Sequence, residues 1–497
     1  MRRKSVYHLS LDGWTWAIAL SLCLTVPMSA IGRGTRASPN VPLHHWTYDV
    51  LERLATEGWL ERTWMDHRPL TRWEAAQAIA IVSPEKPKMS PVFQNLLQEL
   101  EEAFGAELLD LKRNEQTATV SLSYAQGEIL LMEATSGVQP NVDTYVPFHF
   151  EQGLNLGLEG AAGVQITPYV LLFAVPHIRT TRDSIGARLQ AGYVKIHVRG
   201  TDLQIGRGIN WFGPGTHGDF VMTDNAPAFD MIKVSRRMGP WYGCALVGTL
   251  RNQLLRRPVF RADVLLGGFR VVWSYTNRLR VEANVGSLSK GGKRIWEDMR
   301  SLWQTGISEV NQVGEIGITY WPTDGLKIYA TTAGDDFWAV GPARRIIPWG
   351  RKSGYILGMY ASDLLGDGRM DGRWEFTRFV EERGDNWYTH AVPYLYDGWV
   401  IGHPTGHSVY GRASNERDLF LRTTYRWRGA TLGLTVRRAW GELPPAGKED
   451  VHHLVLDLQA HRGIWEVGLK AILLTERVRG DRRNEGRWIL HLRRRVM

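Results

Sequence analysis

The chain has 497 residues, a formal net charge of +9 and only two cysteines. Cys23 lies in an apolar stretch near the N-terminus that we expect to be cleaved off as a signal. Cys244 is then the only cysteine left, which excludes a disulfide framework and a cysteine-based metal site. Outside that stretch the sequence has no run of about 18 apolar residues, which excludes a transmembrane helix.

Residues 1–37 have the pattern of a secretory signal peptide. Arg2, Arg3 and Lys4 precede an apolar stretch from Trp14 to Met28, and the small residues Ala30 and Ala37 follow. The stretch is short for a membrane span and Pro27 closes it, so we expect cleavage after Ala30 or Ala37 rather than an anchor.

The composition favours an outer-membrane barrel over a soluble exported protein. Trp (21), Tyr (17) and Gly (52) are abundant, and aromatic residues gather at both membrane interfaces of a barrel. A basic surface outside the cytoplasm suggests anionic partners, namely surface glycans, lipopolysaccharide phosphates or anionic lipid, and no nucleic acid.

Residues 38–112 predict a small helical segment. Helical spacing runs from His45 to Leu60, a capping box joins Thr71 to Glu74, and a third helix starts at Ser90-Pro91. The stretch from Trp46 through RPLTRWEAA resembles an S-layer-homology-like repeat in pattern. It could bind cell-wall polymer, or it could be a helical plug for a barrel. We favour the plug, because wall-binding modules usually come in sets and only one unit is visible.

From residue 117 to residue 497 the periodicity changes to two. Charged and apolar residues alternate in segment after segment, as in Tyr193 to Arg199, Leu279 to Val285 and His453 to His461. In a soluble sandwich the apolar face would pack on a second sheet, whereas in a membrane barrel it faces lipid and the charged face lines the lumen. About 380 residues at about 20 per strand and turn predict a transmembrane β-barrel of about 16–18 antiparallel strands.

The C-terminus departs from the usual pattern of outer-membrane barrels. These commonly end in an aromatic residue that helps assembly, and this chain ends with three arginines, Val496 and Met497. A last strand from Arg487 to Leu492 is still expected.

The most informative segment is Gly206 to Asp230, GRGINWFGPGTHGDFVMTDNAPAFD. It is too rich in Gly, Pro, Trp, His and Asp for a buried strand or helix, and it lies between strand-like runs. Long, stiff loops on an all-β scaffold often carry binding function. We expect this loop to fold into the barrel or across its mouth.

Two stretches resemble the Wzi-type family of outer-membrane capsule assembly proteins. The first, from Leu203 to Arg237, contains Trp211, a Gly-Pro-Gly turn and an Asp-Asn-Ala-Pro turn; the second, from Arg373 to His407, contains a tyrosine-rich strand and the turn Gly-His-Pro-Thr-Gly. The resemblance implies an outer-membrane barrel of about 18 strands that holds or organises surface polysaccharide, and it implies no enzymatic activity. We also expect no cofactor and no metal, because no metal-ligand spacing appears in the sequence. The non-aromatic C-terminus and a Thr after the second turn depart from the family pattern.

The candidate carbohydrate site combines hydrogen-bonding side chains with aromatic faces, which is the set that polyhydroxylated ligands need. Its members are Arg207, Trp211, His217, Asp224, Asn225, Trp338 and His403. The alternative for the loop residues is an inward-folded, packed turn, and the two interpretations are compatible. Arginine pairs at 236–237, 256–257, 344–345 and 437–438 could bind acidic glycan or lipopolysaccharide, or form a solvated rim.

We therefore expect a monomeric protein of the outer membrane that binds and anchors surface polysaccharide or helps to assemble it. The basic net charge of the protein favours an acidic polysaccharide. The main alternative is a porin-like channel with an N-terminal wall-binding domain. An outer-membrane hydrolase is the third, but no G-x-S-x-G elbow or H-E-x-x-H motif supports it.

Overall fold

The computed structural model describes most of the chain. The described residues are 36–113, 121–134, 153–181, 184–250, 264–290, 310–335, 352–381, 394–396, 399–405, 414–427, 429–443, 447–462, 465–478 and 481–496. Most of the predicted signal peptide and the candidate Trp338 therefore lie outside them.

A helical segment precedes the strands. Its elements are α2 (Thr47–Thr56), η1 (Arg62–Met65), α3 (Arg72–Val82), η2 (Ser83–Lys88), α4 (Pro91–Ala103) and α5 (Gly105–Arg113). The capping box of Thr71 and Glu74 starts α3 as expected, and Pro91 occupies the first turn of α4. Apolar faces of these helices share one core, which includes Leu51, Leu54 and Leu97. None of the described helices is both long and apolar enough to cross a membrane.

The described strands form an 18-stranded antiparallel sheet. They are β1 (Ser121–Ala134), β2 (Gly153–Thr167), β3 (Val170–Thr180), β4 (Ile185–Val198), β5 (Thr201–Gly208), β6 (Phe229–Met238), β7 (Trp241–Leu250), β8 (Val264–Thr276), β9 (Leu279–Lys290), β10 (Val310–Thr323), β11 (Leu326–Asp335), β12 (Lys352–Ala361), β13 (Met370–Glu381), β16 (Ser414–Trp427), β17 (Ala430–Leu443), β18 (Gly447–Arg462), β19 (Trp465–Val478) and β20 (Asp481–Val496). Two short strands, β14 (Leu395–Tyr396) and β15 (Trp399–Val400), pair only with each other.

The 18 strands close on themselves. Each pairs with its neighbours in chain order, and β1 pairs with both β2 and β20. This confirms the predicted membrane barrel. The last strand is longer than expected from the sequence, and Leu492 of β20 lies opposite Ile129 of β1 at the closing seam. The pairing of β20 with β1 therefore closes the barrel.

The wall shows why the alternation of residues predicts this fold. Across β16 to β20, cross-strand partners form outward rows such as Tyr425–Leu432–Leu458–Leu469–Leu490. Intervening inward positions include Arg437, His453 and Asp457, all buried. A shift of one residue would turn the charges toward lipid, so the alternation fixes the register of the wall.

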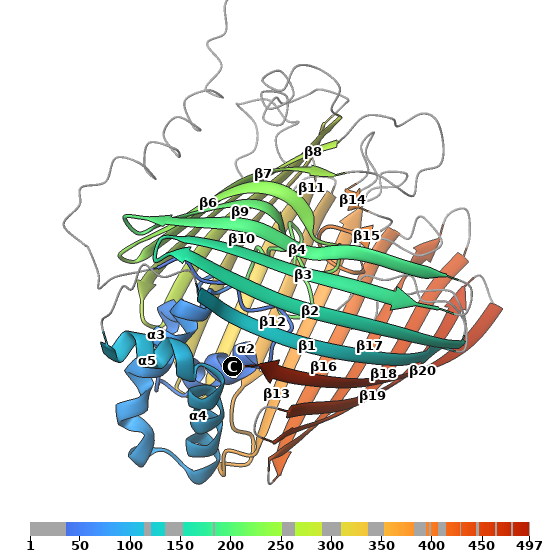
Figure 1. Cartoon of the computed structure of the whole chain (residues 1–497). Coiled ribbons are helices and arrows are strands. Elements are labelled where there is room, and N and C mark those ends of the chain that lie inside the picture. Colours follow the sequence, from blue (N-terminus) through green and yellow to red (C-terminus); the bar gives the residue numbers. More distant parts are fainter. Residues whose placement is uncertain are drawn as a thin grey trace, which may run out of the picture.

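The two ends of the barrel differ. The helices α2 to α5 gather at one mouth, at the lower left of Figure 1. Connections at this end are short, such as 199–200 and 324–325, whereas at the other end β5 and β6 are separated by the long stretch 209–228. Outer-membrane barrels have short periplasmic turns and longer extracellular loops, so we expect the end that carries the helical segment to be the periplasmic one.

Candidate functional site

Residues 209–228 leave the end of β5, turn into the lumen and return to β6. We call this segment the inward loop. The Phe212 N–H donates to the Met222 carbonyl at 2.8 Å, which pins the two arms together. Gly213 has φ +119°, and a side chain there would collide with Asp219. The Gly-Pro-Gly turn thus gives the tight, inward fold that the sequence predicts.

Carboxylates on the opposite wall hold the tip of the inward loop. Glu375 of β13 accepts the N–H of Thr216 at 2.9 Å and of Gly218 at 3.3 Å, and also the Tyr329 hydroxyl at 2.6 Å. Glu315 of β10 accepts the Phe220 N–H at 3.1 Å. Buried backbone donors without partners are costly, so these acidic side chains determine where the loop lies.

Asp219 lies between the loop and the wall. One of its carboxylate oxygens accepts the Gly215 N–H at 2.7 Å, and its side chain is fully buried. Burial, followed by the neighbouring Glu315 and Glu282 carboxylates, raises the pKa of Asp219 well above its usual value. The side chain therefore retains its proton more readily than a solvated aspartate.

The two stretches that carry the family resemblance meet in the lumen. The Thr223 N–H donates to the Ile401 carbonyl at 2.9 Å, and the Asn225 side chain donates to the Val400 carbonyl at 2.8 Å. The Tyr394 hydroxyl donates to the Val221 carbonyl at 3.0 Å. Motifs nearly 200 residues apart in the sequence thus form one packed unit.

A polar cluster fixes the outer side of this unit to β16 and β17. Asp418 receives Arg437 at 2.7 Å and lies 3.3 Å from His217 Nε2. His217 stacks on Phe420 and meets His403 edge to face. Candidate ligand atoms of His217, His403 and Asp418 lie within 4.8 Å of one another, a spacing that a metal ion could use.

The surroundings of this cluster favour an ion-pair network. Arg437 already neutralises Asp418, and both ring nitrogens of His403 contact protein groups, the Thr377 hydroxyl and the Thr405 N–H. Burial, together with nearby His217, lowers the pKa of His403 well below its usual value. A neutral His403 suits its position between these two partners.

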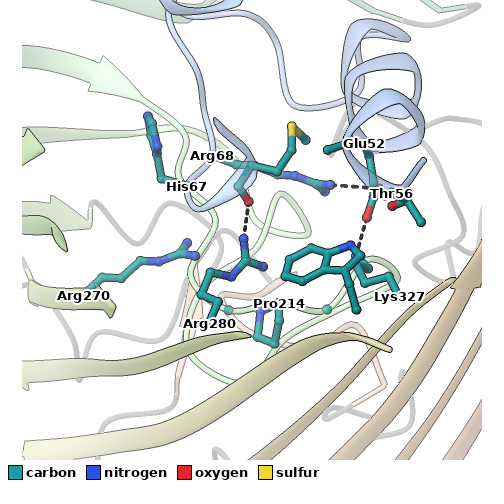
Figure 2. A pocket seen from close by; sticks show the side chains of 13 residues that line it. Glu52, Thr56, His67, Arg68, Pro214, Arg270, Arg280 and Lys327 are labelled. Atoms are coloured by element: carbon teal, nitrogen blue, oxygen red, sulfur yellow. Dashed lines mark hydrogen bonds and ion pairs between the residues drawn. The ribbon is translucent and has the colours of Figure 1, made fainter. Parts of the chain in front are cut away.

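The helical segment contacts the inward loop at its mouth of the barrel, around the pocket in Figure 2. Glu52 of α2 forms ion pairs with Lys327 of β11 and with Arg373 of β13, the latter at 2.9 Å. Burial alone would raise the pKa of Glu52, but Arg373, Lys327 and Arg68 outweigh it and hold the pKa well below the usual range. An anionic Glu52 therefore anchors α2 to the barrel wall.

Two arginines of the barrel wall, on the opposite side of this pocket, bind backbone carbonyls of the helical segment and of the inward loop. Arg280 donates to the Met65 carbonyl at 2.5 Å, as Figure 2 shows. Arg270 donates to the carbonyls of Trp211 at 2.7 Å and Asp66 at 2.9 Å. The cavity that remains has a volume of about 20 Å³, which is room for about one water molecule. Helical segment, loop and wall thus pack closely around this cavity.

The structure separates the candidate site residues into groups. Trp211 and His403, at 4% and 0% exposed, are packed inside the barrel, and His217 lies against Asp418 and Phe420. Asp224 and Asn225 are half-buried on the same loop. Arg207 lies elsewhere: it points outward from β5 and makes a two-point ion pair with Asp230 at 2.9 and 3.0 Å.

The arginine pairs have varied roles. Arg237 binds Asp66 and Arg437 binds Asp418, both inside the protein, whereas Arg438 lies on the outer surface with Asp450. The pairs at 256–257 and 344–345 are outside the described residues. Alternation could have assigned Arg437 to the lumen and Arg438 to the exterior, because neighbours on a strand face opposite sides.

The carboxylates that organise the site were not predicted from the sequence. Glu315, Glu375 and Asp418 are each at most 3% exposed and face inward from β10, β13 and β16. Their inward positions were readable from the alternation, but their partners on the loop were not. In the helical segment, Arg72 belongs to the stretch that resembles a wall-binding repeat. Its guanidinium group donates to both carboxylate oxygens of Glu107, at 2.5 and 3.0 Å.

Together these features define a class of protein, the outer-membrane β-barrel with a packed loop in its lumen and a helical segment at one mouth. The family model described as capsule assembly protein Wzi matches residues 113–439, well over half of the chain. The chain therefore belongs to the Wzi capsule assembly family, and it is a protein of the outer membrane.

The chain is similar to solved structures from two organisms, and the first of them shows the same fold. Wzi of Escherichia coli, described as an outer membrane protein involved in group 1 capsule assembly and a carbohydrate-binding β-barrel, is 15% identical with a TM-score of 0.67, covering 91% of this chain and 99% of that one. Pseudomonas aeruginosa OccK5 is 13% identical with a TM-score of 0.47, covering 76% of this chain and 98% of that one. No match was found among curated proteins.

Proposed function

We propose that this protein binds surface polysaccharide non-covalently at the outer membrane and anchors it or helps to assemble it. Membership of the capsule assembly family supports this role, and the similar Escherichia coli protein is described as carbohydrate-binding. The observation that carries the proposal is that the two family stretches form one unit facing the extracellular end, held by Glu375, Glu315 and Asp418.

The packed interior supports binding over transport. The helical segment and the inward loop meet around a cavity of about 20 Å³, which suits a scaffold better than a wide, water-filled porin channel. We propose that the barrel acts as a monomer without catalysis, cofactor or metal, and that the helical segment is a plug and not a wall-binding domain.

Within the candidate site we propose two roles. Asp224 and Asn225 are half-buried and can offer hydrogen bonds to a sugar, Asn225 through its amide oxygen because its amide nitrogen donates to the Val400 carbonyl. Trp211, His217 and His403 are packed and position the loop. Trp338 remains a predicted ring contact outside the described residues. Arg207 lies on the outer surface and contributes to the rim, where the basic charge favours an acidic glycan.

A co-sedimentation assay with the organism's own surface polysaccharide tests the proposal. We expect the wild-type barrel to retain polysaccharide, and the double variant Asp224→Ala/Asn225→Ala to retain at least fivefold less. A matched control is Gln98→Ala/Glu102→Ala, which removes two exposed polar side chains from α4 at the periplasmic end. Absence of binding by the folded wild type would refute the function, and equal binding by both double variants would remove Asp224 and Asn225 from the site.

A further inference from the structure

A row of arginines lies on the outward surface of the barrel near the extracellular end of β16 to β20. Direct cross-strand partners along the row are Arg417, Trp440, Asp450, Arg477 and Arg482. The next row toward the periplasm contains Arg438 and His452, both about half exposed. Together the two rows hold four arginines and one aspartate. We call them the outer arginine rows.

The position of these rows relative to the membrane follows from the strand register. The next outward row toward the periplasm, Leu421–Val436–Leu454–Leu473–Gly486, is apolar, and three further apolar or aromatic rows follow it. The connection between β16 and β17 lies at the helical end of the barrel, so the arginines lie at the opposite, extracellular edge of the apolar band. At that depth the wall contacts the headgroups of the outer leaflet.

The charges on the rows are only partly neutralised within the protein. Asp450 already binds Arg438 at 2.9 and 3.0 Å and His452 at 3.1 Å. Arg417, Arg477 and Arg482 are exposed and have no ion pair with any described residue. Arg477 and Arg482 are direct cross-strand partners, an arrangement in which like charges repel. With one aspartate beside four arginines, the two rows keep an excess of positive charge that the described residues do not neutralise.

From this arrangement we infer that the outer arginine rows bind the phosphorylated headgroup of an outer-leaflet lipid. Guanidinium groups form two-point hydrogen bonds with phosphate, and a bound phosphate relieves the repulsion between Arg477 and Arg482. The row from Arg417 to Arg482 spans four strand spacings, roughly 19 Å, which suits a headgroup with more than one phosphate. A lipid is favoured over a soluble anion because the apolar rows directly beside the arginines receive its acyl chains.

This inference rests on the outer-membrane location and is independent of polysaccharide binding. The test uses the full-length protein in detergent, titrated with bisphosphorylated lipid A, with bound lipid counted by native mass spectrometry. We expect the triple variant Arg417→Gln/Arg477→Gln/Arg482→Gln to bind lipid A on the order of a hundredfold more weakly, at about fivefold per basic side chain near an anionic lipid surface. The control Lys88→Gln/Lys112→Gln/Arg113→Gln removes three exposed charges from the helical segment and should bind like the wild type.

Two further arms identify the source of the affinity. Dephosphorylated lipid A should bind the wild type as weakly as lipid A binds the triple variant, and the corresponding Arg→Lys triple should fall between the two. Wild-type affinity in the glutamine triple, or undiminished binding of the dephosphorylated lipid, would overturn the inference. So would a triple that keeps lipid A but loses surface polysaccharide, because the rows would then be a glycan site. The Asp224→Ala/Asn225→Ala variant should retain lipid A even if it loses polysaccharide. Heat-modifiable gel mobility confirms that each variant is folded.

Discussion

Arg237 binds both carboxylate oxygens of Asp66, at 2.6 and 2.7 Å, and thereby joins strand β6 to the helical segment. Asp66 is fully buried and Arg237 is one-third exposed, so the pair lies at the edge of the interface. Burial alone would raise the pKa of Asp66, but Arg237 and His67 outweigh it and lower the pKa to about 2. This contact belongs to a series of ion pairs that holds the helices in the barrel mouth.

Asp66→Asn should loosen the helical segment by about 2 kcal/mol, because a shift of one pKa unit corresponds to about 1.4 kcal/mol. Hydrogen exchange of residues 47–113 should become faster while the strands stay protected. Asp110→Asn, which removes the exposed ion pair with Arg36, serves as the control and should change exchange little. Equal protection in Asp66→Asn and wild type would contradict a role for this pair in docking.

The lowered pKa of Asp66 predicts that docking of the helical segment on the barrel depends on pH. A carboxyl whose folded pKa lies below its unfolded value stabilises the folded state above the unfolded value, and this stabilisation is lost as the pH falls through the folded value. For Asp66 the window runs from about pH 4 down to about pH 2. Docking should therefore be constant above pH 5 and weaken below pH 4 in a pH series of hydrogen exchange. Asp66→Asn should show a smaller change over the window, and an identical pH profile would count against this assignment.

Removing Glu375 should release the inward loop. Glu375→Ala leaves loop N–H groups and the Tyr329 hydroxyl without their acceptor, which should cost about 3 kcal/mol of local stability. We expect low conductance for the wild type in planar bilayers and frequent openings for the variant. Glu375→Gln retains an acceptor oxygen and should have a weaker effect. A wide, stable conductance in the wild type would favour the porin-like alternative.

Trp211→Ala should act on stability and not on affinity. The Trp211 side chain is 4% exposed, and the backbone carbonyl of this residue accepts from Arg270. Truncation of the indole therefore leaves a cavity that lowers the free energy of unfolding by about 3–5 kcal/mol. We expect a lower temperature for the heat-induced gel shift and unchanged polysaccharide binding per folded molecule, in both low and high salt. A well-folded variant that loses the salt-resistant part of binding would return Trp211 to the glycan site.

The signal peptide should be cleaved after Ala30 and not after Ala37. Arg36 forms an ion pair with Asp110 at 2.6 Å and lies over the Trp73 ring, and Ala37 is fully buried with its N–H on the Pro168 carbonyl. Cleavage after Ala37 would remove these contacts. Mass determination of the mature protein purified from membranes should give Ile31 as its first residue, and a mature chain starting at Ser38 would refute this.

The sequence by itself determined the barrel and the nature of its wall. Period-two alternation is a local property, and once one face meets lipid, residues such as Leu432 and Arg437 can each face only one side. It also determined that a turn-rich loop lies within residues 206–230, because Gly213 and Pro214 restrict the backbone locally. The structure narrows this loop to residues 209–228, since β5 ends at Gly208 and β6 begins at Phe229.

Only the tertiary structure decided which side chains meet. Glu375 and Thr216, or Asp66 and Arg237, lie more than 150 residues apart in the sequence, and their pairing depends on how the barrel closes and where the loop crosses the lumen. The burial of Trp211 and His403, the outward position of Arg207 and the repulsion between Arg477 and Arg482 follow from the same geometry. Residue type says what a side chain can bind, but its partner, its solvent access and its charge environment come from the packing of distant segments.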